Sequence, residues 1–206
     1  MSDIEDLRQS EDVQQDLREV QELLARHRVV EGLVHRQEMP RHEQVEEIVH
    51  KQHIAELRRK LDRLHPADIA YILEALPLDE RLFVWDLVKA DRDGEILLEV
   101  SDAVRETLIE AMDSHELVAA TEQLDTDEIA DLAPDLPSEV MQDVFRALSV
   151  EEREQLRAAM SYDEDSVGAL MDFEAVTVRE DVSLEAVLRY LGRFDPVPRH
   201  TDHLFV

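Results

Sequence analysis

The sequence predicts an all-α protein: a superhelix of short stacked helices with a repeat of about 12 residues, followed by the beginning of an α/β segment. Three observations favour this fold class. The 206 residues include only 4 Gly and 4% aromatic side chains, which disfavours a fold dominated by β-sheet. The hydrophobic fraction of 44% is enough for a buried core. A helix-capping or turn residue recurs at a regular interval along the middle of the chain.

Residues 1–60 are expected to form an N-terminal helical extension. A weak helical pattern runs from Asp3 to about Val34 and is interrupted near Pro40, and a second helix is predicted from Glu43 to Leu64. Six of the nine histidines fall in the first 65 residues. Because no cysteine or metal-binding motif accompanies them, we interpret the early histidines as solvent-facing, with His65 beginning a helix.

Residues 61–160 are predicted to form the superhelix itself. Stepping forward by about 12 residues from His65 reaches a series of marks, most of them Ser, Asp or Pro, which favour helix starts. The marks are His65, Pro77, Lys89, Ser101, Asp113, Asp125, Pro137, Ser149 and Ser161. Seven residues after each of the first eight marks the side chain is apolar: Ile72, Val84, Ile96, Leu108, Ala120, Leu132, Val144 and Leu156. Such short helices are unstable alone, so they must stack on one another.

Residues 161–206 show a different pattern. The stretch from Phe173 to Val178 alternates with period two and predicts a strand, whereas Ser183 to Leu191 predicts a helix capped by Ser183. We expect a connector, and another strand, from Pro196 to the end. These elements suggest the beginning of a second domain.

The charge of the chain limits its partners. A net charge of −28 leaves no basic surface for nucleic acid or for anionic lipid. The absence of cysteine excludes disulfides and thiolate metal sites and fits a reducing compartment. The sequence contains no apolar stretch long enough for a membrane span, no secretory signal at its start, and none of the common catalytic motifs. We therefore expect a soluble fragment that is not an enzyme.

The acidic residues fall into groups. Five lie three residues after a mark, where a carboxylate caps a helix start, and we interpret them as caps: Asp68, Glu80, Glu116, Glu128 and Glu152. Three more lie deeper in their units: Glu95, Asp131 and Asp143. Asp127 and Asp131 share one helix face, with Asp135 four residues further on. Like charges at this spacing repel, and a hard cation such as Mg²⁺ would reverse the sign of that interaction.

Two stretches of the sequence carry a family resemblance. Residues 64–70 (LHPADIA), followed by residues 73–77 (LEALP), resemble the opening of the cytosolic N domain of MgtE-type magnesium transporters. Residues 162–171 (YDEDSVGALM), followed by residues 176–181 (VTVRED), resemble the junction of these proteins with their first CBS domain. At Asp172 the sequence departs from the Thr-Pro that is usual in the family.

The resemblance implies a homodimeric magnesium channel, with this region on the cytoplasmic face of the cell membrane. In the family, Mg²⁺ is the bound cation, and it lies between the N domain, the CBS domains and the membrane part, where it favours the closed pore. The implied metal ligands in this sequence are Glu95, Asp127 and Asp131. The partners would then be Mg²⁺ and the protein's own CBS and transmembrane domains.

A second interpretation belongs to another class of protein. Stacked short helices also build protein-docking scaffolds, such as the similar superhelix of the flagellar motor switch protein FliG. On that interpretation the acidic side chains meet a basic partner and bind no metal. The CBS-like segment at the end of the sequence favours the transporter over the scaffold.

Overall fold

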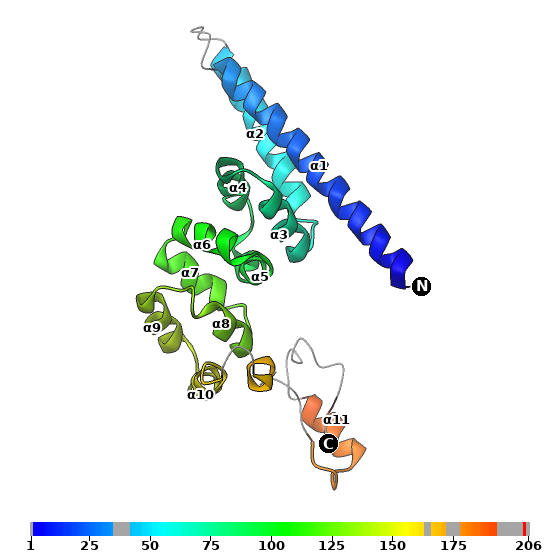
Figure 1. The fold of residues 1–206 in the computed structure, drawn as a ribbon, viewed down its shortest axis with the longest axis vertical. Coiled ribbons are helices and arrows are strands. Elements are labelled where there is room, and N and C mark those ends of the chain that lie inside the picture. The colour runs from blue at the N-terminus through cyan, green and yellow to red at the C-terminus, as the bar shows by residue number, and fades with distance from the viewer. Residues whose placement is uncertain (1, 35–41, 163–165, 172–177, 193–203, 205–206) are drawn as a thin grey trace. The chain divides into compact units, whose positions relative to one another are not determined.

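The computed structural model describes residues 2–34, 42–162, 166–171, 178–192 and 204 (Figure 1). These residues form helices and turns with no strand among them, which confirms the all-α prediction. None of the described helices is both long and apolar enough to cross a membrane. The chain forms two compact units, Met1–Leu124 with Pro134–Val144, and Asp125–Ala133 with Phe145–Val206.

The first unit begins with a helical hairpin made of α1 (Ser2–Val34) and α2 (His42–Leu61), whose axes lie side by side in Figure 1. Its apolar contact comes from a few buried side chains: Val20, Leu24, Leu57 and Leu61. Helix α2 ends three residues before the predicted Leu64. There the Arg92 guanidinium donates hydrogen bonds to the carbonyl oxygens of Leu61 and Leu64, beyond the end of the regular helix.

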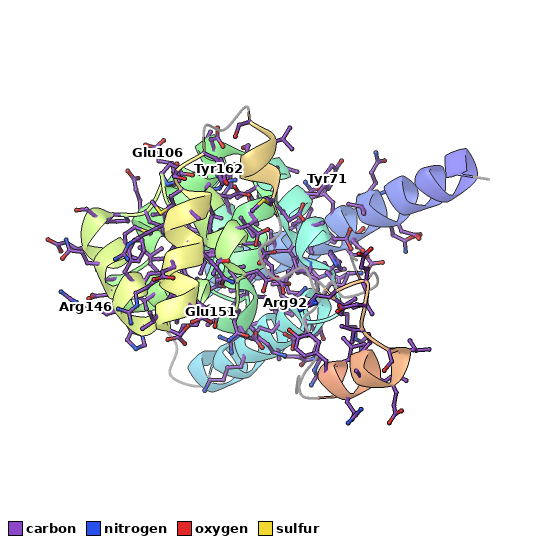
Figure 2. All side chains as sticks on the ribbon, turned by 90° about the horizontal axis from the view of Figure 1, so that it is seen from below. Tyr71, Arg92, Glu106, Arg146, Glu151 and Tyr162 are labelled. Carbon is purple, nitrogen blue, oxygen red and sulfur yellow. The ribbon has the colours of Figure 1, made fainter. Side chains whose placement is uncertain are left out.

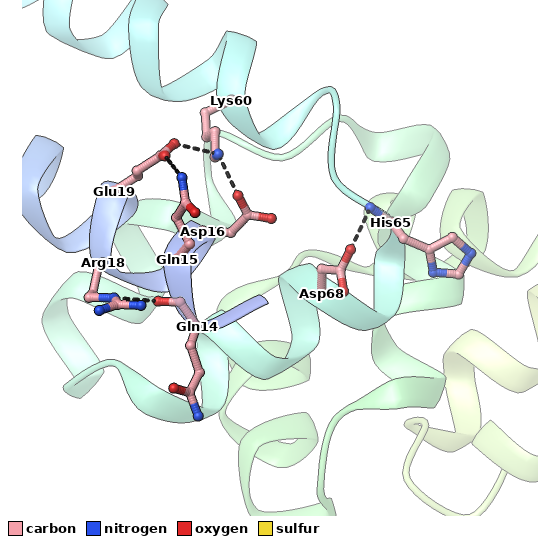
Figure 3. A network of polar contacts seen from close by, with 8 residues as sticks. All are labelled: Gln14, Gln15, Asp16, Arg18, Glu19, Lys60, His65 and Asp68. Carbon is pink, nitrogen blue, oxygen red and sulfur yellow. Dashed lines mark hydrogen bonds and ion pairs between the residues drawn. The ribbon is translucent and has the colours of Figure 1, made fainter. Parts of the chain in front are cut away.

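Charged side chains join the two helices of the hairpin (Figure 3). The Lys60 ammonium group of α2 lies 2.5 Å from a carboxylate oxygen of Asp16 and 2.5 Å from one of Glu19, both on α1. Burial lowers the pKa of Lys60, but the hydrogen bonds to Asp16 and Glu19 outweigh it and the net pKa is raised. The hydrogen bond from Lys60 lowers the pKa of Glu19. These opposite shifts show that the folded hairpin favours the charged form of both groups.

A histidine and an arginine attach α1 to α4 (Leu78–Trp85) of the same unit. The His27 ring is 6% exposed and stacks on the Phe83 ring with 4.7 Å between centroids, so the prediction of a solvent-facing side chain is wrong for His27. Beside it, the Arg28 guanidinium lies 2.8 Å from the Glu80 carboxylate. The hairpin is therefore packed on the repeat through specific side chains.

The predicted marks are the residues that precede the helices. After α4, the described helices of the repeat are η1 (Ala90–Arg92), α5 (Asp93–Glu99), α6 (Asp102–Ala111), α7 (Ser114–Thr121), α8 (Thr126–Leu132), α9 (Ser138–Ala147) and α10 (Val150–Ala159), and α3 (Pro66–Ala75) comes before α4. His65 caps α3, as predicted, because its Nδ1 accepts from the backbone N–H of Ala67. Ser149 and Glu152 form the predicted reciprocal capping box of α10. After the last mark, Ser161, and the described Tyr162, residues 163–165 lie outside the described chain.

The predicted apolar column forms the core of the repeat. All eight of its side chains are buried, and none is more than 2% exposed: Ile72, Val84, Ile96, Leu108, Ala120, Leu132, Val144 and Leu156. Each of these 12-residue repeats therefore buries one apolar side chain at the same position. Burial of this kind between neighbours is what stabilises short helices.

Arginine side chains close the ends of several helices. The Arg81 guanidinium on α4 donates to the carbonyl oxygens of Leu73 and Leu76 at the end of α3. Arg105 on α6 donates in the same way to Leu97 and Val100 at the end of α5. The last carbonyls of a helix lack internal partners, and here each arginine satisfies the helix before its own.

In the second unit α8 packs against α10. Further along, α11 (Leu184–Leu191) confirms the predicted helix, and the Ser183 hydroxyl accepts from the backbone N–H of Ala186. The predicted strand from Phe173 and the segment from Pro196 lie outside the described residues, except for Val178 and Leu204, which have no regular structure.

Candidate functional site

Helix α8 presents two of the three predicted metal ligands on one face. Asp127 and Asp131 are four residues apart on this short helix, so their side chains project from the same side one turn apart. Helix α8 begins after Asp125, whose backbone N–H donates to the Glu128 carboxylate at 2.8 Å. Glu128 thereby acts as a cap. Asp127 is half-buried and Asp131 is exposed.

Asp127 has a carboxylate oxygen in an unusual environment. Its Oδ1 atom is buried and accepts no hydrogen bond from the described residues. Withdrawing a carboxylate oxygen from water without a donor is unfavourable by a few kcal/mol, and such oxygens are normally paired. A cation would satisfy this oxygen, and hard cations such as Mg²⁺ prefer carboxylate ligands. The chemistry of Asp127 therefore fits the metal that the sequence predicts.

Glu95, the third predicted ligand, lies on α5 and is half-buried. Helix α5 belongs to the first compact unit, whereas α8 belongs to the second. The structure thus brings Asp127 and Asp131 together on one helix and places Glu95 in a different unit. Among the described residues, no group of three or more His, Asp or Glu side chains is arranged to hold a metal ion.

The acids predicted to be helix caps behave as expected in four of five cases. Asp68, Glu116, Glu128 and Glu152 each accept a hydrogen bond from the backbone N–H of the mark three residues earlier. Glu80 does not, because its mark is Pro77, which has no N–H to donate. Its carboxylate instead pairs with Arg28.

Asp135, considered with the α8 acids, is also engaged elsewhere. Helix α8 ends at Leu132, before Pro134, so Asp135 no longer continues the helix face. Its Oδ2 atom lies 2.9 Å from the Arg105 guanidinium. Asp135 is therefore a partner of Arg105 and is removed from the set of candidate ligands.

Asp93 is an acid that the sequence reasoning missed. Burial, together with the nearby carboxylates of Glu116 and Asp91, raises the pKa of Asp93 to about 7. Its neighbour Gly94 explains the tight packing, since a Cβ atom there would lie 2.3 Å from the Ala120 carbonyl oxygen on α7. Asp93 lies four residues after the mark Lys89. The same position is an arginine in the two adjacent repeats, Arg81 and Arg105. An acid in place of these arginines was the sequence signal that could have identified Asp93.

The described residues therefore form a domain of stacked short helices with two acidic side chains, Asp127 and Asp131, on one face of α8. Comparison with known proteins gives the family. The model of the MgtE intracellular N domain matches residues 64–165. The chain therefore carries an MgtE-type N-terminal domain.

Individual relatives agree with this assignment. The magnesium transporter MgtE of Thermus thermophilus is 27% identical over 153 residues, which are 73% of this chain and 34% of that protein. The crystal structure of the cytosolic domain of the Mg²⁺ channel MgtE in complex with ATP matches with a TM-score of 0.61 at 26% identity, covering 77% of this chain and 65% of that one.

A second solved structure supports the fold alone. The soluble part of a magnesium transporter matches with a TM-score of 0.53 at 17% identity, over 71% of this chain and 58% of that one. The chain spans only about a third of the length of its curated relative.

Proposed function

We propose that this chain is the cytosolic sensing region of a magnesium transporter, in which Mg²⁺ favours a closed pore. The acids that we propose as its ligands are Asp127 and Asp131 on α8 and, on α5, Glu95. The observation that carries the proposal is the buried Asp127 Oδ1 atom, which has no donor among the described residues. Its position within the residues matched by the MgtE N-domain model supports Mg²⁺ as the cation.

Electrostatics gives the reason for a cation on α8. Asp127 and Asp131 repel each other at the spacing of one helical turn, which costs a few tenths of a kcal/mol. The net charge of −28 adds a general repulsion around them. Bound Mg²⁺ would turn the repulsion into attraction, because it neutralises both carboxylates and takes water as its remaining ligands.

The incomplete ligand set fits a sensor. No described group of three acidic or histidine side chains is arranged around a single metal position, so α8 supplies only part of a site. We propose that acids of the CBS and membrane domains supply the rest, in a homodimer on the cytoplasmic face of the membrane. A cation shared between two parts of a protein binds only when they approach each other, and so it selects the compact state.

Thermal melting of the 206-residue chain tests the proposal. We expect millimolar MgCl₂ to raise the melting temperature more than NaCl of equal ionic strength, because specific binding to the folded state stabilises it. Replacing Asp127→Asn together with Asp131→Asn should abolish the Mg²⁺-specific part and leave the helical circular dichroism spectrum unchanged.

The matched control removes two exposed charges from α10 of the same unit, by Glu151→Gln with Glu154→Gln, and should keep the Mg²⁺ response. A chain extended through both CBS domains should bind Mg²⁺ more tightly than this one. If the Asp127 and Asp131 double variant of the extended chain keeps the full Mg²⁺ response, the assignment of these ligands is wrong.

A further inference from the structure

A groove in the first unit is lined by none of the α8 carboxylates. It runs along α6, past the start of α7, to the turn between Pro134 and Pro137, and has a volume of about 850 Å³. Its accessible apolar lining comes from Ala103, Met112, Pro134 and Pro137, with the buried Ile109 and Leu117 beneath. All of these residues belong to one compact unit. The groove is therefore a feature of that unit by itself.

The rim of the groove is acidic. Asp102, Glu106 and Glu110 follow one another at intervals of one turn along α6, and Asp135 lies across from them. Asp135 is paired with Arg105, and the same guanidinium also serves the end of α5. Glu106 and Glu110 are exposed and form no ion pair with the described part of the chain. Figure 2 shows Glu106 pointing outward from the ribbon.

The folding of α6 does not explain these charges. Asp102 lies in the first turn, where a carboxylate complements the helix dipole, but Glu110 lies near the last turn, where a negative charge is unfavourable. The spacing of Glu106 and Glu110 adds like-charge repulsion. Both costs would be reversed by a positively charged partner at the rim.

We propose that this groove docks a basic amphipathic helix of a partner protein. Leucine-like side chains of the partner would cover Met112, Pro134 and Pro137. Its lysine or arginine side chains would pair with Glu106 and Glu110. Recognition of an amphipathic helix by an apolar groove with a charged rim follows the general mode of helix-in-groove binding. A metal ion is a poorer occupant, since the described carboxylates of the rim form no three-ligand group.

A peptide-binding experiment tests this inference on the full chain. The probe is a fluorescein-labelled peptide of about 18 residues, with Lys and Leu at helical spacing, measured by fluorescence anisotropy in a chelator-containing buffer without Mg²⁺. Glu106→Gln with Glu110→Gln should weaken binding roughly fivefold or more, because two exposed ion pairs are lost. The matched control, Glu151→Gln with Glu154→Gln on α10, should change the affinity less than about twofold.

Two comparisons complete the test. A peptide of equal charge with Ser in place of Leu should bind more weakly, because it cannot cover the apolar floor. Equal losses of affinity in both double variants would attribute binding to the overall negative charge of the chain and overturn the proposal. Equal binding of the two peptides would also overturn it. Self-association of the wild-type chain in sedimentation velocity that disappears in the Glu106 and Glu110 variant would assign the groove to a second copy, against the proposal.

Discussion

The N-terminal hairpin and the repeat that follows it are stabilised in different ways. In the superhelix, each 12-residue repeat buries one apolar side chain at the same position. Arginines donate to the carbonyl oxygens at helix ends, and capping acids accept from the N–H groups at helix starts. In the hairpin, described apolar contacts are few, and Lys60 joins the helices through Asp16 and Glu19. The hairpin also precedes residue 64, where the match to the family model begins. Regular burial therefore stabilises the part that the family model matches, whereas charge pairs between α1 and α2 stabilise the extension.

The largest expected effect comes from the core of the repeat. Leu108→Ala should lower the free energy of unfolding by about 3 kcal/mol, because Leu108 is fully buried and leaves a cavity. Urea denaturation followed by circular dichroism measures it. The matched change in the hairpin, Leu57→Ala, should reduce hydrogen-exchange protection mainly in α1 and α2. Equal loss of protection throughout the repeat would show that the two regions unfold together.

The packing of α5 on α7 gives the next effect. Gly94→Ala should destabilise the protein by about 2 kcal/mol, because the new Cβ atom meets the Ala120 carbonyl oxygen and the helices must separate. The control is Gly192→Ala at the end of α11, where the added Cβ lies 3.4 Å from the Leu188 carbonyl oxygen. If both variants melt at the wild-type temperature, the approach of α5 to α7 is looser than the structure indicates.

A pH-dependent effect is expected at Asp93. Its pKa is raised to about 7 in the folded protein, mainly by burial, so its ionised form opposes folding above that pH. Stability should therefore increase as the pH falls from about 7 toward the ordinary Asp range. In a Mg²⁺-free buffer Asp93→Asn should raise the melting temperature by a few degrees at pH 8 and have little effect at pH 5.

The control for Asp93 is Glu99→Gln, an exposed acid on the same helix. Its effect on the melting temperature should be similar at pH 5 and pH 8. An Asp93→Asn effect that is equally independent of pH would show that Asp93 is ionised in the folded protein at both values.

The smallest effect is expected in the hairpin. Lys60→Met should cost about 1 kcal/mol or less, because the pairs with Asp16 and Glu19 are only partly buried. The pKa of Glu19 is lowered, so this contribution is present at neutral pH and is lost as the pH falls below the ordinary range of Glu. Chemical denaturation at pH 7 and pH 3, with exposed Arg59→Met on the same helix as the control, measures the difference. A larger cost at pH 3 than at pH 7 would contradict the role of the ion pairs.

The sequence by itself determined the repeat, its register and its helix starts. These depend on local rules: a capping residue acts within its own first turn, and an apolar side chain one or two turns later faces the neighbouring helix. Ile72 and the seven side chains at the same position of the following repeats, up to Leu156, are all buried for this reason. The same local rules identified Asp127 and Asp131 as two acids on one face.

Only the tertiary structure decided which acids pair with side chains distant in the sequence. Glu80 pairs with Arg28 and Asp135 pairs with Arg105, and in each case the partner is dozens of residues away in the chain. The burial of His27 on Phe83 and the raised pKa of Asp93 likewise come from neighbouring helices. Charge pairing and desolvation depend on what surrounds a group in space, so no pattern along the sequence could assign them.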